Sequence, residues 1–168
     1  MNNLLKETVL VRLKESTGLQ QLFYGLLFVV CFFFVGGTVY TILTTIRLMA
    51  TLNPLPGALL IFTAVYVLMQ ASLAYGFYTA RLWIAYALLS HTTLIIFTAF
   101  VLLPLFGLNG YAHNTLLGAI PFGVLGCLTY AKRTWLYSAN VFLPTLLYTL
   151  LICFSLALSV MIYVYTPA

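Results

Sequence analysis

The sequence predicts an all-α integral membrane protein whose five transmembrane helices follow a short interfacial amphipathic helix. Three observations lead to this fold class: the composition, the lengths of the apolar runs and the positions of the basic residues. Hydrophobic residues make up 64% of the 168 residues and charged residues only 5%, whereas a soluble domain carries roughly 25% charged residues. A chain so poor in charge cannot cover a water-facing surface, so a soluble globule is excluded.

The N-terminal segment, residues 1–18, is the only part of the chain that is dense in charge. In a helix, Leu5, Val9 and Leu13 share one face, and basic residues flank that face. This pattern predicts an interfacial helix on the cytoplasmic surface of the membrane. The rest of the chain, 19–168, is predicted to form a single five-helix membrane domain.

Five apolar runs follow this segment, and Pro, Gly, Asn or basic residues separate them. None of the runs alternates polar and apolar residues as the strands of a membrane barrel do, so helices are expected. A helix needs roughly 20 apolar residues to cross a bilayer, and only the fourth run falls clearly short of this. The predicted spans are 22–46, 57–78, 82–106, 115–130 and 135–165.

The basic residues orient the predicted bundle. If the N-terminus is inside, six basic residues lie on the inner side and Arg47 alone lies on the outer side, which is a strong positive-inside bias. The bias also favours a full crossing by the short fourth run. An odd number of spans then puts the C-terminus outside, and we expect the protein in the inner (plasma) membrane of a bacterium. The inner six are Lys6, Arg12, Lys14, Arg81, Lys132 and Arg133.

The two predicted inner turns resemble each other at a shift of 52 residues, which aligns residues 78–83 with residues 130–135. Both segments contain Tyr, Arg and Trp at matching positions. One interpretation is a duplication, in which the hairpins 57–106 and 115–165 are repeats about an axis along the membrane normal. The other is that Tyr, Trp and Arg independently prefer membrane interfaces.

Two polar residues inside predicted spans are candidates for contact with a ligand or a partner. Folding the hairpin 57–106 at residues 80–81 brings Gln70 and His91 to the same depth, because each is ten or eleven residues from the turn. Asn140 is a third candidate of this kind, near the start of the fifth run. The alternative is that such polar residues hold two helices together, which contributes well under about 2 kcal/mol.

Cationic and aromatic residues at the inner turns are candidates for binding anionic lipid headgroups. These residues also serve as simple markers of topology, which is the alternative interpretation. The candidates are Arg81, Lys132, Arg133, Trp83 and Trp135.

The fourth run contains small residues at every fourth position, Ala119, Gly123 and Cys127. Such a stripe lets a second helix approach closely, so it predicts helix packing. Pro121 interrupts the same run and removes one backbone donor. Interrupted helices also mark substrate sites in transporters, so packing and transport are both open for this span.

Catalytic chemistry has little support in this composition. The chain contains no Asp, and its only carboxylate side chains, Glu7 and Glu15, precede the first span. This excludes paired carboxylates within the membrane. No zinc-binding or nucleophile motif occurs either. We therefore expect no enzymatic activity, no catalytic residues, no cofactor and no metal.

These observations favour a small non-enzymatic integral membrane subunit, or an accessory or assembly factor of a larger inner-membrane complex. The alternative is a small-solute transporter or channel with a polar site at mid-membrane, and a lipid- or quinone-handling enzyme ranks third. The expected partners are membrane lipids and other membrane protein subunits. Nucleic acid is not expected, because seven basic residues scattered over the chain form no basic face.

Overall fold

A computed structural model describes residues 8–51, 57–105, 107–138 and 140–165. Five of its helices are long and apolar enough to span a membrane. Within the described ranges no strand forms, and the one isolated bridge pairs Arg81 with Tyr137. The all-helical membrane fold predicted from the sequence is therefore confirmed.

The spans correspond closely to the predicted apolar runs. The third span is α5, a π-helical turn η1 and α6 in continuous succession, and short 3-10 turns flank α7. The elements are α2 (Val9–Glu15), α3 (Leu19–Thr51), α4 (Gly57–Tyr78), α5 (Trp83–Phe97), η1 (Thr98–Leu102), α6 (Leu103–Leu105), η2 (Asn109–Tyr111), α7 (Ala112–Ala131), η3 (Arg133–Trp135) and α8 (Phe142–Tyr165).

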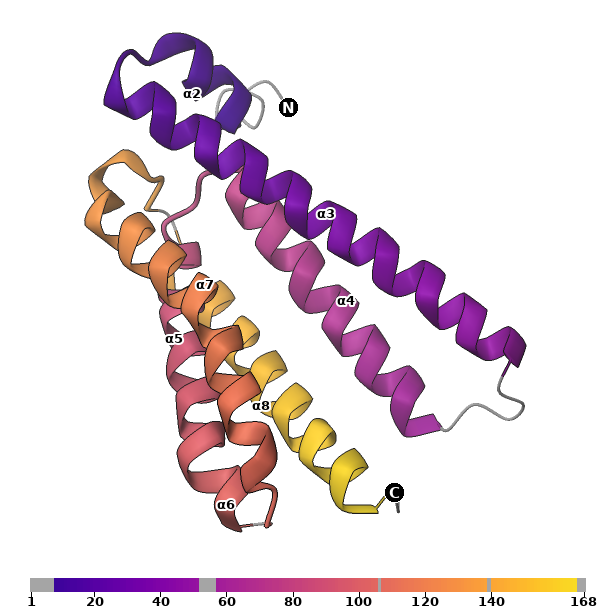
Figure 1. The fold of residues 1–168 in the computed structure, drawn as a ribbon. Coiled ribbons are helices and arrows are strands. Elements are labelled where there is room, and N and C mark those ends of the chain that lie inside the picture. Colours follow the sequence, from indigo (N-terminus) through magenta and orange to yellow (C-terminus); the bar gives the residue numbers. More distant parts are fainter. Residues whose placement is uncertain (1–7, 52–56, 106, 139, 166–168) are drawn as a thin grey trace.

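The spans form two arms that diverge away from α2 (Figure 1). Helices α3 and α4 pack side by side in one arm, and α5 packs on α7 in the other. Helix α8 contacts both α4 and α5 and so joins the two arms. The tightly packed hairpins are thus α3–α4 and α5–α7. The duplication of hairpins 57–106 and 115–165 remains a prediction.

We call the end of the bundle that carries α2 the α2 end. There the guanidinium of Arg12 donates a hydrogen bond of 2.8 Å to the carbonyl of Trp135, and the Tyr24 hydroxyl donates one of 2.6 Å to the same oxygen. Val9 is completely buried and Leu13 packs against the core. Leu5 lies outside the described residues. Part of the predicted apolar face of this segment therefore packs against the protein itself.

The fifth helix starts later than the sequence predicts. Leu136 is extended and Asn140 has a φ of +50°, and none of the described residues between η3 and Phe142 is helical. Pro144 consequently lies in the first turn of α8, where its missing N–H breaks no helical hydrogen bond.

The fourth span is an uninterrupted helix of 20 residues, α7, with Pro121 inside it. At 1.5 Å per residue it is about 30 Å long, which matches the hydrocarbon thickness of a bilayer. The apolar run 115–130 therefore underestimates the length of this helix, because the polar residues that precede the run are part of α7.

The buried apolar residues form one core cluster. Its members come from α2, α3, α4, α5 and α8, so the core holds both arms together. The largest fully buried apolar side chains in this cluster are Phe77, Leu27, Leu73, Ile84, Leu88 and Ile152.

Candidate functional site

The α4–α5 turn and the α7–α8 connection are joined by backbone hydrogen bonds. The N–H of Leu82 donates to the carbonyl of Tyr137 at 2.8 Å, and the N–H of Tyr137 donates to the carbonyl of Ala80 at 2.9 Å. Ala80 has a φ of +47°, which tightens the turn. This arrangement places Arg81 beside the start of α8.

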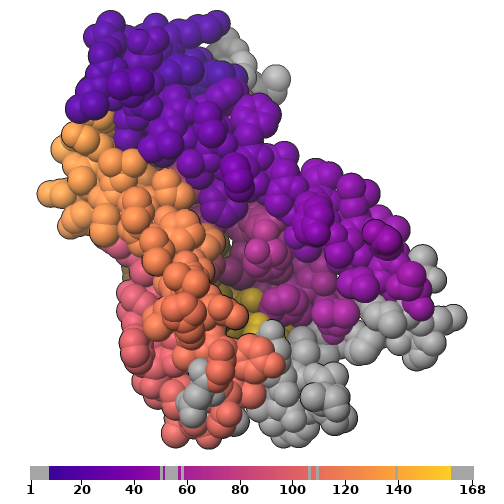
Figure 2. Space-filling view, in the orientation of Figure 1, coloured from indigo at the N-terminus to yellow at the C-terminus, as the bar shows by residue number. Residues whose placement is uncertain are grey.

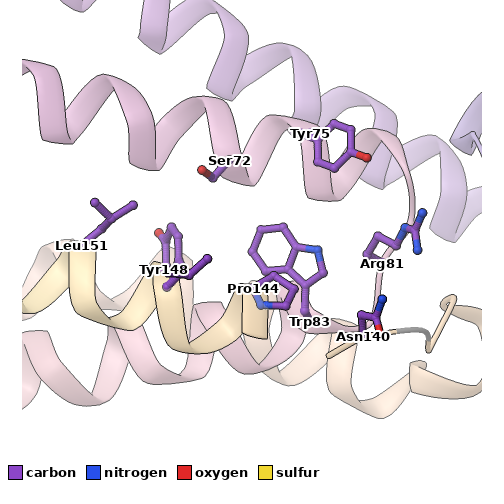
Figure 3. A pocket seen from close by; sticks show the side chains of 9 residues that line it. Ser72, Tyr75, Arg81, Trp83, Asn140, Pro144, Tyr148 and Leu151 are labelled. Carbon is purple, nitrogen blue, oxygen red and sulfur yellow. The ribbon is translucent and has the colours of Figure 1, made fainter. Parts of the chain in front are cut away.

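A cavity of about 370 Å³ lies between α4 and α8 and reaches the α4–α5 turn. Figure 3 shows it from close by, with α4 on one side and α8 on the other. Figure 2 shows α8, in yellow, between α7 and α4, where the surface of the molecule is hollowed. The cavity is lined by Ser72, Tyr75, Arg81, Trp83, Asn140, Pro144, Leu147, Tyr148 and Leu151.

The cavity has a polar end and an apolar end. Arg81 and Asn140 lie close together at one end, and Leu151 lies at the other (Figure 3). The guanidinium of Arg81 lies 4.5 Å from the centre of the Tyr137 ring, a cation–π contact. The candidate Asn140 is therefore part of this cavity, together with a cation.

The tryptophan at this turn does not extend toward solvent. Trp83 is only 6% exposed, and its ring lies 6.3 Å from that of Tyr148. Sequence reasoning assigned Trp83 to lipid headgroups from interface preference alone, and that assignment stays a prediction. The structure places its indole in the wall of the cavity.

His91 is held by two aromatic neighbours. Its Nδ1 shares a hydrogen bond of 2.9 Å with the hydroxyl of Tyr148 on α8. Its ring stacks on that of Phe122 on α7, with centroids 4.2 Å apart and planes 9° apart. At the adjoining position on each helix, the Thr149 hydroxyl donates to that of Ser90 at 3.2 Å. These contacts make His91 a junction between α5, α7 and α8.

Gln70 has different neighbours from His91. Its side chain lies against Gly37 of α3, where a Cβ would be 3.1 Å from Oε1 of the amide. This oxygen is buried and has no hydrogen-bond partner among the described residues. The structure thus brings Gln70 to the α3–α4 contact and His91 to the contact among α5, α7 and α8.

The remaining lipid candidates lie on the α7–α8 connection. The ammonium of Lys132 is 4.7 Å from the Trp135 ring, and the guanidinium of Arg133 is 4.8 Å from the Tyr130 ring. Together with Arg12 and Arg81, they concentrate positive charge at the α2 end. The C-terminal part of α3, which carries Arg47, lies toward the opposite end (Figure 1).

The face of α7 that packs on α5 includes two of the three predicted small residues. Ala119 is buried, and a Cβ at Gly123 would lie 3.2 Å from Cγ2 of Thr92. Cys127, by contrast, is exposed. The neighbouring Gly126 contacts α5 in its place. Because a helix has 3.6 residues per turn, residues on one face are spaced by three as well as by four positions.

Several residues of the site were missed by sequence reasoning. Gly126 could have been predicted to face α5, since it lies three residues after Gly123. Ser72 and Tyr75 could not have been assigned to the cavity, because an isolated Ser or Tyr in a span has many roles. Tyr148 is separated from His91 by 57 positions, and no local pattern indicates such a pair.

Comparisons with known proteins do not add to this description: no protein-family model, curated protein or solved structure matches this chain. Among the described residues, no three of His, Cys, Asp and Glu are grouped so that they would hold a metal ion.

Proposed function

We propose that this protein is a non-enzymatic subunit or accessory factor of a larger complex in a bacterial inner membrane. The observation that supports the proposal is an exposed hollow on α3, the most peripheral of the spans. It measures about 490 Å³ and is formed by Val29, Phe32, Phe33, Gly36, Gly37 and Tyr40.

Only one of the two glycines in this hollow is required by a contact within the chain. Gly37 gives room to the Gln70 side chain of α4, whereas a Cβ at Gly36 would meet nothing within 4 Å. Glycine inside a helix is less favourable than alanine by roughly 0.5–1 kcal/mol. In membrane helices, small residues offset this cost by letting another helix approach closely. Among the described residues nothing fills the space beside Gly36, so we assign the hollow to a transmembrane helix of another subunit.

Aromatic side chains make the walls of the hollow. Phe33 is 82% exposed and Tyr40 is 72% exposed, one on each side of Gly36 along the chain. A partner helix seated over Gly36 would cover both rings, and aromatic residues are enriched at the centres of protein interfaces.

The alternative is a small-solute transporter or channel with a polar site at mid-membrane. Its best support is the row of polar groups between α5 and α8. These groups, however, bond with one another: His91 with Tyr148 and Ser90 with Thr149. Satisfied pairs of this kind favour helix packing over the transport of a solute.

The proposed orientation has the α2 end in the cytoplasm and the end of α8 outside, because most basic residues lie at the α2 end. We expect a cysteine at Ala131 to react with a membrane-impermeant maleimide only after the membrane is opened. A cysteine at Asn114, at the other end of α7, should react in intact cells. The three natural cysteines are first replaced by alanine. Labelling of both new cysteines in intact cells would contradict a full crossing by α7.

The subunit proposal is tested by Gly36→Leu. Leucine there should fill the hollow and release stoichiometric partner proteins that co-purify with the parent chain after extraction in mild detergent. Gly118→Leu is the matched control, because a Cβ at this α7 glycine also meets nothing within 4 Å. The partners are quantified by mass spectrometry, and unfolding in detergent verifies that both variants are folded.

Two results would overturn the subunit proposal. One is that the parent chain purifies without a stoichiometric partner. The other is that Gly36→Leu separates only two copies of this chain, which would make the hollow a contact within a homodimer.

A further inference from the structure

We propose that the cavity between α4 and α8 binds one membrane lipid with an anionic phosphate headgroup, drawn from the leaflet at the α2 end. The dimensions of the cavity suit such a ligand. On α8 its lining extends from Pro144 to Leu151, which is about 10 Å at 1.5 Å per residue, and Asn140 and Arg81 line it beyond the start of that helix. One leaflet is about half of the ~30 Å hydrocarbon thickness. The cavity therefore covers most of the depth of a single leaflet.

The polar end supplies the groups that a lipid phosphate requires. The Arg81 guanidinium is a planar fork of donors that matches phosphate oxygens. Its contact with the Tyr137 ring restrains it, and the backbone pairing of Leu82 with Tyr137 fixes the turn that carries it. Asn140 and Tyr75 add an amide and a hydroxyl to the same lining.

The balance of charge also favours an anionic lipid. The only carboxylate side chains of the chain are Glu7 and Glu15, against seven Lys and Arg. The concentration of cations at the α2 end therefore exceeds what the chain's own side chains neutralise. Phosphate groups in the adjacent leaflet provide the missing negative charge.

The apolar end suits an acyl chain. Pro144, Leu147 and Leu151 form its wall on α8, and the Tyr148 ring lies among them. The Tyr148 hydroxyl already shares a hydrogen bond with His91, so it does not need a hydrogen-bond partner on the ligand. A small polar solute would leave this half of the cavity unmatched, whereas a lipid fills both halves.

Trp83 provides a direct reporter of occupancy. It lines the cavity and is 6% exposed, so lipid chains in the surrounding bilayer have little access to its ring. The chain has two tryptophans, and Trp135→Phe leaves Trp83 as the sole emitter. Bromine on an acyl chain quenches indole fluorescence at contact. A brominated lipid that enters the cavity will therefore quench Trp83.

The experiment uses Trp135→Phe protein reconstituted in vesicles that contain phosphatidylglycerol and phosphatidylcholine. Two samples with equal mole fractions of the two lipids are compared: in one the phosphatidylglycerol is brominated, and in the other the phosphatidylcholine. We expect brominated phosphatidylglycerol to quench Trp83 about fivefold more effectively, the preference that one basic residue confers near a membrane surface. Equal quenching by the two lipids would overturn the proposal.

Variants separate the cavity from general attraction to basic residues. Arg81→Gln should abolish the preference, whereas the double variant Lys132→Gln/Arg133→Gln, with both changes outside the cavity lining, should keep most of it. Ser72→Phe, in the α4 wall of the cavity, should block the cavity and lower quenching by both lipids even if Arg81→Gln fails to fold. If only the double variant loses the preference, the lipid headgroup does not bind at Arg81 and the proposal is contradicted.

Inorganic phosphate distinguishes a lipid from a free anion. Added at constant ionic strength, it should leave the preference for brominated phosphatidylglycerol unchanged, because it gains nothing from the apolar end. If phosphate alone removes the preference, the cavity binds a soluble anion and the lipid proposal is wrong.

Discussion

Replacing Gly76 by alanine is expected to destabilise the protein by about 1–3 kcal/mol, the usual cost of forcing extra atoms into a packed core. A Cβ at this position would lie 2.6 Å from Cζ2 of Trp83 and 2.8 Å from Cγ1 of Ile84. Ile84 is completely buried, so it has no free space to move into. The α4–α5 turn would have to open, and the backbone hydrogen bond from Arg81 to the Gly76 carbonyl would weaken.

The matched control for this change is Gly118→Ala. That glycine is also inside a helix, but a Cβ there meets nothing within 4 Å, so alanine should be neutral or stabilise the helix by up to about 1 kcal/mol. Both free energies of unfolding are measured by titration with sodium dodecyl sulfate from a mild detergent. If Gly76→Ala is as stable as the parent, Trp83 and Ile84 do not pack beneath α4 as the structure shows.

The sequence was sufficient to predict the five spans because the signal for a membrane helix is local. The second span, Gly57–Tyr78, agrees with its prediction at both ends. The fifth does not, since hydropathy cannot detect that Asn140 adopts a positive φ and delays the helix. The length of an apolar run thus predicts that a span exists, whereas backbone conformation determines where it begins.

The partners of each span could not be predicted in the same way. Nothing near His91 in the sequence indicates Tyr148, and depth alone suggested Gln70, which instead lies against Gly37. Depth limits which residues are able to meet, but it does not say which helices face one another. Trp83 illustrates the same limit, because its preference for an interface gave no hint that Gly76 leaves space for its ring.

Replacing Gly126 by leucine is expected to have an effect of similar or larger size, because it separates α7 from α5. A Cβ at Gly126 would lie 3.1 Å from Cδ2 of Leu89 and 3.2 Å from Cβ of Leu88. Leu88 is fully buried, so the remaining carbons of leucine would have to displace the whole helix. We expect a loss of about 3 kcal/mol, the upper end for overpacking.

Two neighbouring positions turn this change into a test of which face of α7 is in contact. Gly123→Leu should cost less than Gly126→Leu, because its nearest neighbour is the methyl end of the Thr92 side chain. Cys127→Leu should stay within about 0.5 kcal/mol of the parent, because Cys127 is exposed. The same titration with sodium dodecyl sulfate ranks the three variants. If Cys127→Leu proves as damaging as Gly126→Leu, the contact follows the every-fourth-residue stripe predicted from the sequence, and the rotation of α7 in the structure is wrong.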